Sequence, residues 1–147
     1  MKMIVIGIDG SRDSEAAVAE ALRLAGDLGA SVTFVCARVA PNIMLGEPFY
    51  QRELDAQAGH ARAVVDDALA RAAAAGVEAD YEILDGPPAE AILRVAETHD
   101  ADLLVVGSRG LGAVQGVLFG SVSKSLVTRS DRPVLVVKQP REAPVAA

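Results

Sequence analysis

A chain of 147 residues, 51% apolar and 23% charged, is large enough for one domain with its own core. A net charge of −6 without a basic cluster, together with only 3% aromatic residues, argues against duplex or single-stranded nucleic acid as a partner. The single cysteine, Cys36, excludes an internal disulfide and is interpreted as an inert core thiol. No apolar run approaches the roughly 20 residues of a membrane span, and no signal-peptide pattern is present. We therefore expect a cytoplasmic protein without a membrane partner.

The first half of the chain alternates between strand and helix patterns. Residues 3–8 are apolar and predict a buried strand. A helix is expected from near Asp13, with Ser11 or Asp13 as its N-cap, and it should end at Gly29. Residues 31–37 predict the second strand.

Residues 38–51 lack a regular pattern and predict a loop of unusual length, either a functional lid or a partly disordered insertion. A long helix is predicted over 52–75, and a strand near a sheet edge over 77–84. A third helix is predicted over 89–98. His60 and His99 are interpreted as solvated surface histidines, because neither is paired at metal-ligand spacing.

The last part of the chain completes an α/β pattern. A fourth strand and helix are followed by a fifth strand over 132–138, whereas 139–147 predict a disordered tail. Five strands alternating with four helices predict a single domain over 1–138, an open five-stranded parallel sheet wound on both faces. If strands one and four are neighbours, Asp9 and Gly107 emerge into one crevice, where such folds bind ligands.

The fifth strand also raises the question of a partner. It is apolar on both faces although a last strand is expected at the sheet edge, and an apolar edge invites pairing with another chain. A symmetric dimer through 132–138 would cover it, and burial under a neighbouring helix is the alternative.

An anion site is expected where the fourth strand ends. A buried strand over 103–106, a glycine loop and a helix beginning at Ser121 follow one another there. Free backbone N–H groups and the positive end of the helix dipole favour phosphate at such a place. The Rossmann and P-loop patterns are both absent. The residues have instead the spacing G-x2-G-x9-G-S, with glycines at Gly107, Gly110 and Gly120 before Ser121.

This spacing resembles the ATP-binding signature of the universal stress protein family. The resemblance covers about Met3 to Val137: I-V-I-G-I-D-G-S is similar to the family's opening strand and turn, and A-D-L-L-V-V-G-S-R-G to its fourth strand. It implies the adenine nucleotide alpha hydrolase-like strand order 3-2-1-4-5, an ATP ligand, a homodimer through strand five, and a role in stress survival with nucleotide occupancy as a signal. Because the chain has no acidic cluster, Mg²⁺ would be held mainly by phosphate oxygens.

Two strand ends supply the candidate residues for the nucleoside. Ile8 and Asp9 close the first strand, and the resemblance implies that Asp9 binds the ribose. Its carboxylate also suits a magnesium-bound water, and the alternative is a cap for the next helix. By family position alone, the backbone of Ala37 would meet the adenine edge.

The glycine loop and the following helix supply the candidate residues for the phosphates. The hydroxyls of Ser121 and Ser123, with the N–H groups of Ser121 and Val122, are suited to β- and γ-phosphates, although Ser121 is also compatible with an ordinary N-cap. Arg109 either clamps a phosphate or points into water. The alternative for the glycines is that they only let a helix pack tightly on the sheet.

The expected function is ATP binding by a stress-response regulator without dedicated catalytic machinery. No residue is an evident base near a γ-phosphate, and no arginine finger is identifiable. A slow ATPase or a nucleotidyl-transfer enzyme on the same scaffold is the first alternative, although the H-x-G-H and S-G-G-x-D-S patterns of adenylylating relatives are absent. A ligand-free dimeric interaction module is the second, and the intact glycine spacing argues against it.

Overall fold

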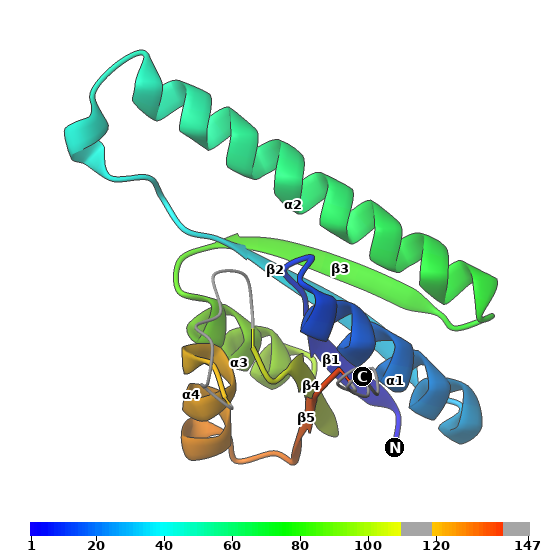
Figure 1. Cartoon of the computed structure of the whole chain (residues 1–147). Helices are drawn as coiled ribbons and strands as arrows, with labels where there is room; N and C mark the ends of the chain where they lie inside the picture. Colours follow the sequence, from blue (N-terminus) through cyan, green and yellow to red (C-terminus); the bar gives the residue numbers. More distant parts are fainter. Residues whose placement is uncertain (110–118, 140–147) are drawn as a thin grey trace, which may run out of the picture.

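Strands and helices alternate along the residues that the computed structural model describes, 1–109 and 119–139. Figure 1 shows the arrangement. The elements are β1 (Met3–Gly7), α1 (Arg12–Leu28), β2 (Ser31–Arg38), the short 3-10 helix η1 (Ile43–Leu45), α2 (Phe49–Ala74), β3 (Ala79–Asp85), α3 (Pro88–Thr98), β4 (Leu103–Gly107), α4 (Ser121–Arg129) and β5 (Val134–Val137).

The five strands form one parallel sheet in the order β3-β2-β1-β4-β5. This confirms the predicted fold class and strand order, including the edge position of β3. Ile4 of β1 lies opposite Val32 of β2 and Leu103 of β4, so β1 is central. From β1, the strand order runs through β2 to β3 on one side and through β4 to β5 on the other. The topological switch point therefore lies at the carboxyl ends of β1 and β4.

Two hydrophobic cores lie on opposite faces of the sheet, because successive side chains of a strand point to opposite sides. Ile4 and Ile6 pack with α1 and α2 on one face, and Val5 packs with α3 and α4 on the other. Figure 1 shows these two pairs of helices around the sheet. All three side chains are completely buried. None of the helices in the described part of the chain is long and apolar enough to cross a membrane.

Helix α1 begins and ends where its local signals predict. The Ser11 hydroxyl accepts a hydrogen bond from the N–H of Ser14 and is the N-cap, and Gly29 ends the helix with a φ of 67°. At a φ in this left-handed region, glycine is the least strained residue. Asp13, the other N-cap candidate, lies inside the helix.

Other predicted boundaries were wrong by a few residues. Helix α2 begins at Phe49 rather than at 52, and the predicted loop 38–51 also contains η1. β3 begins at Ala79 rather than at 77, because the N–H of Val77 bonds to the carbonyl of Ala72 and closes α2. β5 covers only Val134–Val137 because a turn closed by the side chain of Ser130 precedes it. Beyond Gln139, the predicted tail lies outside the described residues.

Candidate functional site

The carboxyl ends of β1 and β4 bring the predicted site residues to one edge of the sheet. Ile8 extends β1 by donating its N–H to the carbonyl of Val35, and Ser108 extends β4 by donating to the carbonyl of Val137. Both Ile8 and Ser108 are buried. The chain therefore leaves β1 and β4 from residues whose positions are held by hydrogen bonds to the neighbouring strands.

Asp9 forms the turn between β1 and α1. One carboxylate oxygen accepts the N–H of Ser11 at 2.9 Å, and its own N–H donates to the hydroxyl of Ser14 at 3.1 Å. Its backbone oxygen lies 3.1 Å from Nε2 of His60 on α2. Asp9 was alternatively predicted to cap the next helix, and this is observed in part. Its carboxylate bonds to Ser11, and Ser11 is the residue that caps α1.

Gly107 is required by packing, independently of any ligand. A Cβ built on it would lie 2.6 Å from the backbone carbonyl carbon of Asp13 and 2.8 Å from the carbonyl oxygen. The end of β4 therefore lies against the first turn of α1, as the alternative interpretation of the glycines proposed for this position. Gly110 lies outside the described residues.

Asp13 joins three segments at this junction, a role that was not predicted. Its carboxylate accepts the hydroxyl of Ser108 at 2.8 Å, the N–H of Arg109 at 3.2 Å and the N–H of Gln139 at 3.2 Å. Burial alone would raise the pKa of Asp13, but the hydrogen bonds from Ser108, Gln139 and Arg109 and the Arg109 charge outweigh it and lower the pKa. Arg109 Nε lies 3.7 Å from the same carboxylate, on a half-exposed side chain.

Ser108 also holds the start of α4. Its carbonyl accepts the N–H of Gly120 at 2.6 Å and the hydroxyl of Ser123 at 2.9 Å. The Ser123 hydroxyl was predicted to bind phosphate, but it is buried and donates to the carbonyls of Ser108 and Gly120 instead, which leaves the backbone N–H of Ser123 for a phosphate. Gly120 offers no side-chain cap, and the first-turn amides of Ser121 and Val122 have no carbonyl within their own helix.

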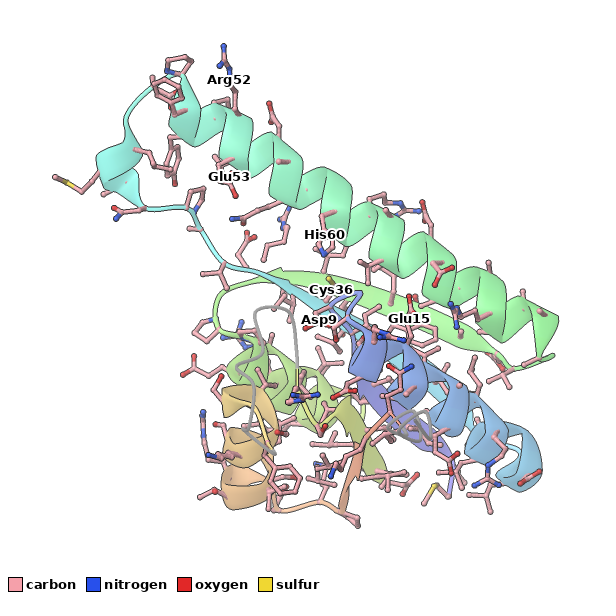
Figure 2. The ribbon with its side chains drawn as sticks, viewed as in Figure 1. Asp9, Glu15, Cys36, Arg52, Glu53 and His60 are labelled. Carbon is pink, nitrogen blue, oxygen red and sulfur yellow. The ribbon has the colours of Figure 1, made fainter. Side chains whose placement is uncertain are left out.

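His60 lies between two cavities and lines both of them. A cavity of about 380 Å³ lies between the end of β2 and α2, and another of about 220 Å³ lies between α1 and α2. Ala37, the predicted adenine contact, lines the first cavity, whereas Ile8 lines the second. Figure 2 shows His60 projecting from α2 toward the strand ends near Asp9.

The cysteine and the histidines have different environments from one another. Burial, and to a smaller extent the charge of Asp9, raise the pKa of Cys36 to about 11 against the effect of Arg38, and the thiol is buried in the core as predicted. His60 is exposed and His99 is partly exposed, as expected of surface histidines, although Nε2 of His60 lies 3.1 Å from the backbone oxygen of Asp9 and Nε2 of His99 lies 3.1 Å from the Glu82 carboxylate. Within residues 1–109 and 119–139, no group of three or more His, Cys, Asp or Glu side chains is placed to hold a metal.

Comparisons with known proteins identify the family. The model of the universal stress protein family matches residues 1–138. A universal stress protein of Thermus aquaticus is 39% identical over 138 residues, covering 93% of this chain and 98% of the relative. The structure of the universal stress protein UspA from Lactobacillus plantarum is 26% identical with a TM-score of 0.82, over 92% and 97% of the two chains. A universal stress protein solved in complex with cAMP is 32% identical with a TM-score of 0.72, over 92% and 96%. The chain therefore belongs to the universal stress protein family.

Proposed function

We propose that this protein binds an adenine nucleotide, with ATP as the principal ligand, and that occupancy by the nucleotide regulates a stress response in the cytoplasm without dedicated catalytic machinery. The observation that carries the proposal is the junction at Ser108, which holds the N-terminus of α4 against the end of β4. The amides of a helix N-terminus at the switch point of a parallel sheet are suited to phosphate. The related protein solved with cAMP supports an adenine nucleotide as the ligand.

Each part of the nucleotide has a proposed set of contacts. The phosphates are assigned to the loop that joins β4 to α4 and to the first turn of α4, the ribose to Asp9 beside Ile8, and the adenine edge to the backbone of Ala37. Asp9 and Asp13 already accept backbone N–H groups, so a Mg²⁺ ion would be held mainly by phosphate oxygens. The proposed phosphate contacts are Gly107, Arg109, Gly110, Gly120, Ser121, Val122 and Ser123.

ATP binding is expected to raise the melting temperature of the protein. A ligand at 100 times its Kd stabilises a protein by about 2.7 kcal/mol, which corresponds to about 5 to 10 °C for a chain of this size. An Asp9→Asn variant is expected to bind ATP about ten-fold more weakly, because the amide oxygen still accepts the Ser11 N–H while the negative charge is lost. Scanning calorimetry and titration calorimetry measure the two effects.

The control for this experiment is Asp27→Asn, which removes the same charge from an exposed ion pair in the last turn of α1. It is expected to bind ATP as the wild type does. A wild-type protein whose melting temperature does not change with ATP, and which carries no adenine nucleotide when purified from cells, would contradict the proposed function.

We also propose a homodimer through β5, in which the edge strand pairs with its counterpart. The carbonyls of Pro133 and Val137 accept bonds from β4, so the N–H of Val136 faces the open side of the strand. A Val136→Pro substitution is expected to leave the bonds to β4 intact and to give a monomer. Light scattering at micromolar concentration measures the mass, with circular dichroism to verify folding, and a wild-type monomer would refute the proposal.

A further inference from the structure

The strand β3 forms an outer edge of the sheet that is long and regular. Its seven residues, Ala79–Asp85, pair one for one with consecutive residues of β2. In Figure 1 this strand lies on the outside of the sheet, with β2 on its inner side. Proteins commonly block such an edge with proline, lysine or a bulge, because a regular edge is a template for pairing with another chain. The sequence of β3 contains neither proline nor lysine.

The backbone groups of β3 are divided between β2 and the open edge. The carbonyl of Glu78, just before β3, accepts a bond from β2, and the N–H of Gly86, just after it, donates to β2. Alternate residues of a parallel strand bond to the same neighbour, so the backbone groups of Tyr81 and Ile83 face away from β2. The N–H of Tyr81 is bonded to the Asp80 carboxylate at 2.8 Å. Tyr81 therefore offers its carbonyl at the open edge, and Ile83 offers both an N–H and a carbonyl.

The side chains of β3 differ between its two faces. Tyr81 and Ile83 pack against the core that lies beneath α1 and α2. Asp80 and Glu82 lie on the opposite face, because successive side chains of a strand alternate. Asp80 is exposed, and Glu82 is half-buried with its carboxylate 3.1 Å from Nε2 of His99. The open edge is therefore acidic on the face that carries α3, whereas its other face continues a hydrophobic core.

A second copy of this chain is a poor occupant for the β3 edge. In an antiparallel pairing of two β3 strands, the Asp80 and Glu82 side chains of both copies would lie on one face. Like charges opposite each other destabilise a strand pair. The other edge of the sheet differs, because β5 consists only of valine and leucine and carries no such charge. The acidic side chains of β3 thus disfavour self-pairing and attract a segment of opposite charge.

We propose that the edge of β3 binds an extended segment of another protein in which basic and apolar side chains alternate. The segment lies antiparallel to β3, and the residue opposite Ile83 exchanges two backbone hydrogen bonds with it. Its basic side chains lie opposite Glu82 and Asp80, and its apolar ones lie beside Tyr81 and Ile83. Arg62 of α2 lies over the Tyr81 ring at 5.2 Å, which disfavours basic side chains on that face. The proposal does not depend on nucleotide binding.

Titration calorimetry with a short synthetic peptide in which lysine alternates with valine tests the proposal. The protein is expected to bind this peptide at least about ten-fold more tightly than a peptide with glutamate in place of lysine. Methylation of the valine amides, which face β3, is expected to abolish binding, whereas methylation of the lysine amides, which face away, is expected to change the affinity by less than about three-fold. The methylated peptides separate strand pairing from a general attraction of basic peptides to a chain of net charge −6.

Asp80→Lys is expected to weaken binding of the lysine peptide about ten-fold, because it reverses the charge opposite a basic side chain. Asp27→Lys is the matched control, since it makes the same change at an exposed ion pair in the last turn of α1, and it is expected to keep the wild-type affinity. A wild type that does not bind the lysine peptide, or that binds it equally well with methylated valine amides, would overturn the proposal. Either result would leave the proposed nucleotide binding, which is measured with ATP, unaffected.

Discussion

A Gly107→Val variant is expected to lose about 3 kcal/mol of its free energy of unfolding. The added Cβ would lie 2.6 Å from a backbone carbon of Asp13 and 2.9 Å from the Asp13 Cβ. Backbone atoms cannot rotate aside as the end of a long side chain can, so the end of β4 and the first turn of α1 must separate. Urea denaturation followed by circular dichroism measures the loss.

Gly59→Ala is the control for this substitution. Gly59 lies within α2, and a Cβ built on it has nothing within 4 Å, so the alanine is expected to stabilise the protein by about 0.5 to 1 kcal/mol. A Gly107→Val variant with wild-type stability would contradict the packing role. Because Gly107 is closely packed, a Gly107 variant that fails to bind ATP could do so through a disturbed fold rather than a lost phosphate contact. The Asp9→Asn variant avoids this ambiguity, because its amide oxygen still accepts the Ser11 N–H.

Asp13→Asn is expected to cost about 2 to 3 kcal/mol of stability at pH 7. In the wild type the carboxylate accepts donors at both of its oxygens, including the N–H groups of Arg109 and Gln139. An amide group presents an NH₂ to one of these donors, and that partly buried N–H is then left without its acceptor. Denaturation of both proteins at several pH values measures the difference.

The cost of the Asp13→Asn substitution is expected to shrink in acid. The pKa of Asp13 is lower in the folded protein than its ordinary value, so protonation is resisted by the folded state. The stability that the carboxylate provides is complete above the unfolded-state pKa of about 3.9 and is lost as the pH falls through the lower folded-state pKa. If the free energies of unfolding of the variant and the wild type differed by the same amount at pH 7 and in strong acid, this role of the charge would be contradicted. Asp131→Asn, at an exposed pair with Arg132, is expected to change stability by less than about 0.5 kcal/mol.

The sequence predicts the fold well because the relevant signals are local. Ser11 and Gly29 define the ends of α1 by their own side-chain and backbone preferences. The apolar runs of the central strands reflect burial on both faces, which a parallel sheet wound by helices requires. The errors at the ends of α2, β3 and β5 have a different origin. Val77, for example, closes the preceding helix through a backbone bond that its side chain does not indicate.

Much of the candidate site depends on contacts that no local pattern contains. Asp13 was a candidate only for an N-cap, and its bond to Ser108 crosses 95 residues of sequence. Ala37 and His60 belong to a predicted strand and a predicted helix, but the cavity that they both line depends on how far α2 extends along β2. The glycine spacing predicts the location of the phosphate site, but the close packing of Gly107 against Asp13 is evident only from the distance between them in the structure.

The bonds of Asp13 also have a consequence for folding during synthesis. Its partners are 95, 96 and 126 residues away along the chain, and the last of them, Gln139, follows the final strand. Contacts over such separations form late, because the intervening chain must be ordered first. A nascent chain that still lacks β5 therefore leaves this buried carboxylate incompletely bonded. The junction between α1, β4 and α4 therefore reaches its final form only after β5 and Gln139 have been synthesised.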